Sequence, residues 1–134
     1  MESRLFNKFL NNDDTLRVYE GGQLIFSSRK DRLLPLMEYI AHHAPVHQQV
    51  TIFDKIIGNA AALLSIKADC REVYSPFGSE LAIKTLDKYG IKHHIGEAVS
   101  YIQKDDGTDM CPMEKLSLNR EPEEFYAILK DAIK

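Results

Sequence analysis

The sequence predicts an α/β fold: a three-layer α/β/α arrangement around a mixed sheet opened by a β-hairpin. Two observations support this prediction. Glu20-Gly21-Gly22-Gln23 separates two strand-like runs, and a Gly-Gly pair in that position is typical of a two-residue hairpin turn. Further along, strand-like runs alternate with amphipathic helices, which places helices on both faces of a sheet. With 134 residues, 44% of them hydrophobic, residues 1–134 are expected to form a single domain.

The first part of the chain provides a short helix, the hairpin and a second helix. An apolar stripe at helical spacing indicates a helix over Glu2–Asn12. The hairpin strands are predicted at Thr15–Tyr19 and Gln23–Ser27. Asp31 is then expected to cap the N-terminus of a helix that ends near His43.

The rest of the chain alternates between strands and helices. Val50–Phe53 is either a strand or an extended approach to a helix, and Asp54 is expected to cap a mostly apolar helix over Lys55–Lys67. The later elements are predicted as a strand at Arg71–Tyr74, a loop at Ser75–Ser79, a helix at Glu80–Tyr89 that stops at Gly90, a strand at Ile91–Ile95 and a closing helix at Glu121–Lys134.

Composition excludes several function classes. Seventeen basic and twenty acidic residues give a formal net charge of −3, so there is no global field to attract a nucleic acid or an anionic membrane. No apolar run approaches the roughly 18 residues of a membrane-spanning helix, and no signal-type region follows the start of the chain. We therefore expect a cytoplasmic protein without a membrane or nucleic-acid partner. In that reducing compartment Cys70 and Cys111 are expected to be free thiols.

Small residues gather near the start of the predicted Lys55–Lys67 helix. Gly58 and Ala60–Ala62 would let another backbone or a ligand approach closely. The free N–H groups of a helix N-terminus favour anions, and Lys55 would add a positive charge beside Asp54. The alternative is that the small residues only allow close packing on the sheet, with Asp54 as the cap. The segment does not match the phosphate loop of nucleoside triphosphatases.

Cys111 is the second candidate. Proline favours the first position of a helix, so Pro112 would place Cys111 at the N-cap and Glu114 at the third position of a capping box. A thiol at a helix N-terminus is activated towards nucleophilic or redox chemistry. The alternative is a half-buried, inert cysteine in a short turn.

Ser79 and Glu80 are the third candidate site. Ligands of open α/β sheets gather at the carboxyl ends of the strands, so the loop before Glu80 and the Asp54 segment would line one pocket. The alternative makes Ser79 a helix cap and Glu80 a favourable first-turn acid. The histidines lie around a helix end or on a strand, without the ligand geometry of a metal-binding helix.

Several motifs of the chain are distinctive in combination: Asp54-Lys55, Gly58, Ala60-Ala61-Ala62, Lys88-Tyr89-Gly90-Ile91-Lys92 and Asp109-Met110-Cys111-Pro112-Met113-Glu114. Together they resemble an uncharacterised prokaryotic family, domain of unknown function 1893. The resemblance extends from the hairpin to Lys115 and implies a fold similar to that of cytidine deaminase, with a hairpin at the start of the sheet and helices on both faces.

The chain departs from the active deaminases at their zinc site. Those enzymes hold zinc with a His-x-Glu motif on one helix and Pro-Cys-x-x-Cys at the next, and the Glu moves protons. Here Gly58-Asn59-Ala60-Ala61 contains neither a ligand nor an acid, and Ser75–Glu80 contains no cysteine. The resemblance therefore implies no metal, no cofactor and no hydrolytic deamination by that mechanism.

The leading hypothesis is a non-zinc, deaminase-like protein that binds a small anionic or nucleotide-like ligand between two helix N-termini. The binding residues would be Asp54, Lys55, Gly58, Ser79 and Glu80. The alternative is an enzyme that uses Cys111 as nucleophile or redox centre, with Glu114 and Lys55 nearby as acid–base groups. A second alternative is a structural or regulatory interaction module that forms a homodimer.

Overall fold

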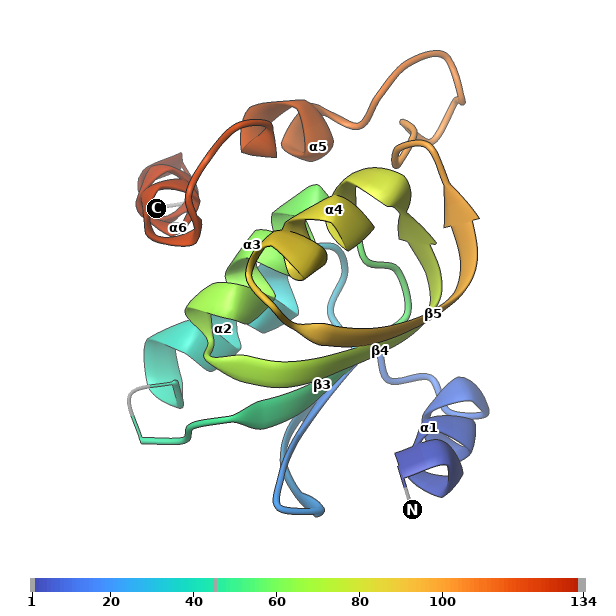
Figure 1. Cartoon of the computed structure of the whole chain (residues 1–134), viewed down its shortest axis with the longest axis vertical. Helices are drawn as coiled ribbons and strands as arrows, with labels where there is room; N and C mark the ends of the chain where they lie inside the picture. Colours follow the sequence, from blue (N-terminus) through green and yellow to red (C-terminus); the bar gives the residue numbers. More distant parts are fainter. Residues whose placement is uncertain (1, 45, 133–134) are drawn as a thin grey trace.

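The computed structural model describes residues 2–44 and 46–132, which form one five-stranded sheet and six helices (Figure 1). The strands lie in the order β2-β1-β3-β4-β5. β1 is antiparallel to β2 and β3, whereas β3, β4 and β5 are mutually parallel. The predicted mixed sheet of an α/β fold is therefore confirmed. Its strands are β1 (Leu16–Glu20), β2 (Gln23–Ser28), β3 (Val50–Asp54), β4 (Cys70–Ser79) and β5 (Lys92–Val99).

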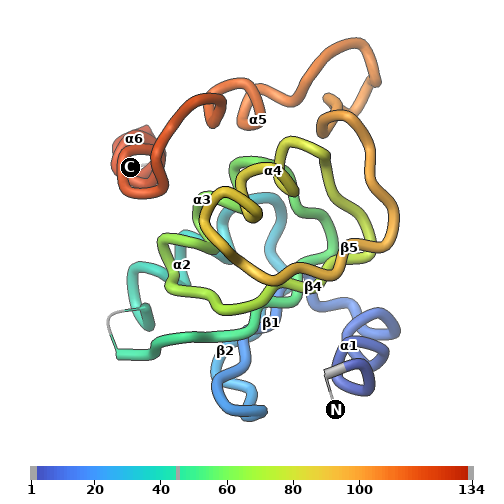
Figure 2. The backbone as a smooth tube through the Cα atoms, in the orientation of Figure 1, coloured from blue at the N-terminus to red at the C-terminus, as the bar shows by residue number. Residues whose placement is uncertain are grey.

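The helices cover the two faces of the sheet unequally (Figures 1 and 2). One face carries α2, α3 and α4, with α5 and α6 packed on α3, and the opposite face carries α1. Across the described residues no helix is both long and apolar enough to span a membrane. The helices are α1 (Glu2–Leu10), α2 (Leu34–His42), α3 (Asn59–Lys67), α4 (Glu80–Lys88), α5 (Pro112–Ser117) and α6 (Pro122–Ala132).

The predicted hairpin is confirmed. Gly21 and Gly22 both have positive φ, 58° and 83°, as the tight type I′ turn requires. The strands pair from Glu20 with Gln23 out to Leu16 with Ser28, so each lies within one residue of its predicted range.

The start of α3 differs from the prediction. The helix begins at Asn59 with Gly58 as its N-cap, and Asp54 does not cap it. The chain between them stays extended because Ile57 bonds to β4: its N–H donates to Phe77 O (3.0 Å), and its carbonyl accepts the N–H of Ser79 (3.1 Å). A residue whose N–H and carbonyl both bond to a strand cannot also form a helical turn, so the helix starts after it.

The loop predicted at Ser75–Ser79 is also wrong, because β4 continues through Ser79. The extra length pairs with β5 on one side and with Ile57 on the other. Gly78 permits the second contact: a Cβ there would lie 2.8 Å from Ile57 Cγ2 and 3.0 Å from Ile57 O. Pro76 and Gly78 weaken the local strand pattern, and the pairing with two neighbours overrides it.

Two helix ends also differ from their predicted positions. The N-cap of α2 is Leu33 rather than Asp31, and α1 ends at Leu10. The positive φ of Gly90 (70°) follows the end of α4, as expected for a glycine that terminates a helix. The closing helix is predicted to reach Lys134, and its last two residues lie outside the described part.

Alternating strand residues build two separate cores. Val18, Ile52 and Val73 face α2, α3 and α4 in the main core. On the opposite face, Phe53 packs with Phe9 of α1, at 5.8 Å between ring centroids, in a smaller aromatic cluster. Figure 2 shows why this second cluster matters: α1 lies apart from the other helices, so its attachment depends on the sheet.

We predict that Phe9→Ala lowers the free energy of unfolding by about 3–5 kcal/mol, because it removes a fully buried ring from the cluster that holds α1. Leu10→Ala is the matched control: Leu10 lies on the same helix but is 40% exposed, so about 0.5 kcal/mol is expected. Urea unfolding measures both values. Equal losses in the two variants would show that the aromatic cluster does not hold the helix.

Candidate functional site

A cavity of about 420 Å³ lies where the segments before α2 and α3 meet the chain between β5 and α5. Its volume is within the range of roughly 300–1,000 Å³ that is common for small-molecule sites. Much of the wall is apolar, and it is formed by Leu33, Ile56, Ala60, Ala61, Ile102 and Met113.

Most of the residues that the sequence singles out line this cavity: Asp54, Lys55, Gly58, Cys111 and Glu114. Ser79 and Glu80 do not. The buried hydroxyl of Ser79 accepts the N–H of Ala82 (3.0 Å) and caps α4, while Glu80 is exposed. The cavity therefore lies beside the starts of α2 and α3, not beside the starts of α3 and α4.

Asp54 is a buried acid in the wall of the cavity. The residue is 9% exposed, and one carboxyl oxygen accepts the N–H of Ile56 at 3.3 Å. Within the described ranges no ion pair involves it. Burial raises the pKa of Asp54 to about 7. This carboxyl can therefore accept or donate a proton near neutral pH.

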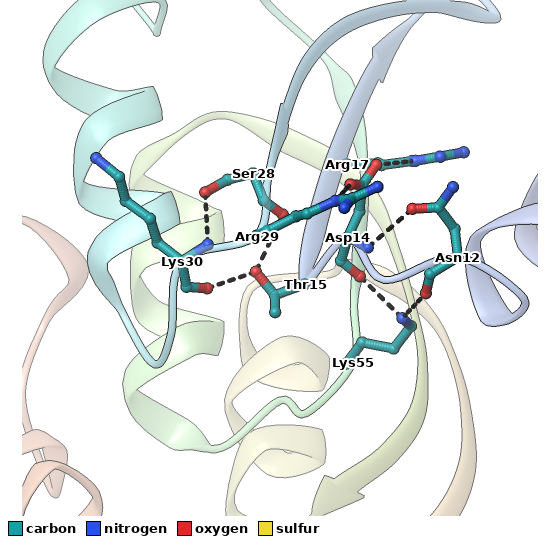
Figure 3. Close-up of polar contacts among 8 residues, drawn as sticks. All are labelled: Asn12, Asp14, Thr15, Arg17, Ser28, Arg29, Lys30 and Lys55. Atoms are coloured by element: carbon teal, nitrogen blue, oxygen red, sulfur yellow. Dashed lines mark hydrogen bonds and ion pairs between the residues drawn. The ribbon is translucent and has the colours of Figure 1, made fainter.

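The ammonium of Lys55 is used by the protein itself. Its Nζ donates to the carbonyls of Asn12 (2.7 Å) and Asp14 (2.8 Å), as Figure 3 shows. The same atom lies 4.5 Å from the centroid of the Phe9 ring. Only the stem of Lys55 remains to form the cavity wall. Lys55 thus holds the segment before β1 in place. Its ammonium is therefore less available to bind an anion than the sequence predicts.

Two arginines hold the Asp14 side chain next to this lysine (Figure 3). Asp14 accepts from Arg17 Nε (2.7 Å) and Arg29 Nε (3.1 Å). Burial alone would raise the pKa of Asp14, but the hydrogen bonds and charges of these arginines outweigh burial and lower it. Asp14 is therefore a compensated buried acid, unlike Asp54.

Glu114 joins three parts of the chain. Its buried carboxylate accepts the N–H of Asn59 at 2.6 Å and the N–H of Ile102 at 2.9 Å. The predicted capping box is wrong, because the N–H of Cys111 donates instead to Ile102 O (2.8 Å). Glu114 also explains Gly58: a Cβ at that position would lie 2.7 Å from a carboxylate oxygen of Glu114.

Asn59 is a buried polar residue that the sequence analysis missed. Its Nδ2 donates to the carbonyl (3.1 Å) and hydroxyl (2.9 Å) oxygens of Ser117, and its Oδ1 accepts the hydroxyl of Thr85. Asn59 thus links α3 to both α4 and α5. An asparagine inside a run of small apolar residues was the available signal.

Cys111 occupies the predicted N-cap of α5, half-buried and without a capping hydrogen bond from its side chain. Both cysteines are free thiols. Cys70 is buried in the main core, and burial raises its pKa to about 12, which makes it unreactive. Cys111 is therefore the thiol that can report on the cavity.

Arg32 and Asp105 line the cavity and were also missed by the sequence analysis. Arg32 Nη2 lies 3.1 Å from Asp105 Oδ2, so this ion pair joins the segment before α2 to the turn after β5. The two residues are 73 positions apart, and no local pattern connects them. In the described part of the chain no group of three or more His, Cys, Asp or Glu side chains is arranged to hold a metal ion.

Comparisons with known proteins agree on one family. A family model described as TM1506, domain of unknown function (DUF1893), matches residues 5–133. The chain is similar to the crystal structure of a DUF1893 family protein (TM1506) from Thermotoga maritima, with a TM-score of 0.85 and 29% identity over 98% of this chain and 88% of that chain. None of the curated proteins matches.

Glu114→Gln is predicted to lower the free energy of unfolding by about 2–3 kcal/mol, since the amide NH₂ would face one of the two backbone N–H donors in a buried site. Glu97→Gln, an exposed change on β5, is the control and should have little effect. Chemical unfolding at neutral pH measures the difference. A tolerated Glu114→Gln would show that the charge of Glu114 is dispensable for the fold.

Asp54→Asn is predicted to gain stability over the wild type as the pH rises. Below pH 3.8 the carboxyl is protonated in both the folded and the unfolded state, so it makes no contribution. Between 3.8 and about 7 only the unfolded state has released the proton, so wild-type stability falls through this window and the loss is complete above it. Asparagine stays neutral and avoids this loss. Urea unfolding of both proteins across this range measures the difference.

Asp14→Asn is the control of opposite sign. Since the folded pKa of Asp14 is lowered, its ionised form stabilises the wild type at neutral pH, and this advantage disappears on acidification through that lowered pKa. If the two variants showed the same pH trend, the contrast between an uncompensated and a compensated buried acid would be refuted.

Proposed function

We propose that this chain, which belongs to the DUF1893 family, binds a small nucleotide-like molecule in the cavity that Asp54 lines. The observation that carries the proposal is the Asp54 carboxyl itself: it is nine-tenths buried, lines a cavity of about 420 Å³ and has no ion-pair partner among the described residues. Perturbed acids that line cavities are typical of binding and catalytic sites.

The energetics of Asp54 favour a ligand. Burying a carboxyl without a cation or a full set of hydrogen bonds destabilises a protein, and the backbone N–H groups of Ile56 and Lys55 compensate only in part, since the pKa of Asp54 is still raised. A ligand group that adds a hydrogen bond to this carboxyl would recover some of the loss. Because the carboxyl changes protonation near pH 7, it can accept from an N–H or donate to a ring nitrogen.

The walls combine apolar side chains with the polar carboxyl of Asp54. Ala60 and Ala61 leave space near the start of α3, while Leu33, Ile102 and Met113 provide apolar contact. A nucleobase has apolar faces and hydrogen-bonding edges, and sites that bind one commonly combine apolar or aromatic contact with polar groups at its edge. This match is the reason to name nucleotide-like molecules among small ligands.

The anionic part of such a ligand does not belong at the start of α3. The N–H of Asn59 is already occupied by the Glu114 carboxylate, which would repel a second anion. The ammonium of Lys55 is held by two backbone carbonyls. The base-like part is therefore expected inside the cavity, and any charged group towards its opening.

Alkylation of Cys111 tests the proposal at the cavity itself. Nucleobases and nucleosides are added singly, and the rate of carbamidomethylation at Cys111 is followed by mass spectrometry. A ligand in the cavity should slow this rate in proportion to occupancy, because Cys111 lines it. Cys70 is the internal control, since it is buried and should stay unmodified while the protein remains folded.

For a ligand that donates an N–H to Asp54, Asp54→Asn should weaken the protection about tenfold, because the amide NH₂ presents a donor where the carboxylate presents an acceptor. Glu80→Gln, outside the cavity, should leave it unchanged. Failure of every nucleobase and nucleoside to protect Cys111 would refute the proposal. That result would favour the alternative of an interaction module.

A second candidate function is an enzyme that uses Cys111 as its nucleophile. One observation favours it: the half-buried Cys111 thiol lines the same cavity as Asp54, whose pKa near 7 would let it accept a proton. An activated nucleophile would be alkylated faster than a free cysteine peptide at neutral pH. If Cys111 is alkylated more slowly than the free peptide, at the same rate in the wild type and in Asp54→Asn, this candidate is contradicted and the binding proposal stays intact.

A further inference from the structure

We propose that Arg32 binds the anionic group of the cavity's ligand, and that Arg32 forms an ion pair with Asp105 while the cavity is empty. The ligand class that follows is a nucleoside phosphate, with its base near Asp54 and its phosphate at Arg32. This inference rests on the proposed function, and the experiment below separates the failure of one from the failure of the other.

The charge distribution around the cavity singles out Arg32. Lys55 and Arg32 are the two cations in its lining, and the Lys55 ammonium is bound to backbone carbonyls. The guanidinium of Arg32 is paired only through one nitrogen with Asp105, at 3.1 Å. Its remaining donors have no hydrogen-bond partner within the described ranges. Arg32 is thus the cation that an incoming anion can reach.

The Arg32–Asp105 pair is of the weak kind. The two side chains are 67% and 92% exposed, and exposed ion pairs contribute little because water screens them. A phosphate offers a guanidinium two parallel hydrogen bonds and more negative charge than a carboxylate. A ligand phosphate can therefore displace the Asp105 carboxylate from Arg32. In the absence of ligand, Asp105 occupies the position on Arg32 that the phosphate would take.

The backbone at Arg32 provides a second observation. Its φ is 60°, in the left-handed region that a residue with a Cβ rarely adopts. Such conformations persist where surrounding structure fixes them, and they are frequent at ligand sites. This turn lies directly before α2 and places Arg32 in the lining of the cavity, which Asp105 also lines.

The experiment compares each nucleoside with its 5′-monophosphate, using protection of Cys111 to obtain both affinities. In the wild type the monophosphate should bind about tenfold more tightly than its nucleoside. Arg32→Gln should abolish this preference. Asp105→Asn should instead strengthen monophosphate binding by up to about fivefold, because the competing carboxylate is gone. In both variants the affinity for the nucleoside should change less than the affinity for the monophosphate.

The opposite signs are the decisive feature. Both substitutions break the same ion pair, so a merely structural contact would change monophosphate binding in the same direction in both variants, and that result would overturn the inference. Equal affinities for nucleoside and monophosphate in the wild type would also overturn it, while nucleoside binding would still support the proposed function. If nucleosides and monophosphates alike fail to protect Cys111, both proposals fall.

Discussion

The buried Glu114 carboxylate is the interaction on which the cavity depends. It accepts backbone N–H groups from Asn59 and Ile102, so it joins the start of α3 to the chain that follows β5. A carboxylate that accepts two backbone donors is well compensated for its loss of water. Together with the Asn59–Ser117 hydrogen bonds, this link holds the segment after β5 against α3, where it forms one wall of the cavity.

Much of the fold follows from local patterns. The glycine pair specifies the hairpin turn, and the alternation of strands with amphipathic helices specifies the mixed sheet. The errors lie where distant residues decide the local conformation. Ile57 stays extended because it bonds to β4, some twenty positions later, and β4 is long because Ile57 and β5 pair with its second half. Neither pairing is visible in a local pattern.

The site could be predicted in part for the same reason. The carboxyl ends of parallel strands meet at one edge of a sheet, and this rule predicts one pocket for the Asp54 segment and the loop before Glu80. Asp54 and Gly58 line the cavity, whereas Ser79 is buried and caps α4. Arg32 and Asp105 could not be paired from sequence, because their contact depends on the route of the chain after β5, which Glu114 fixes.

The contrast between Glu114 and Asp54 separates the scaffold from the reactive part of the cavity. Both are buried acids in its wall, and sequence alone treats them alike. Glu114 accepts one backbone N–H at each oxygen, and the donors lie 55 and 12 positions away in the chain, so its bonds hold separate segments together. Asp54 accepts backbone N–H groups of its own segment, those of Ile56 and Lys55, and has no ion pair within the described ranges, and burial raises its pKa to about 7. An acid whose interactions are incomplete gains from a ligand that completes them, which is why binding chemistry belongs at Asp54 and structural support at Glu114.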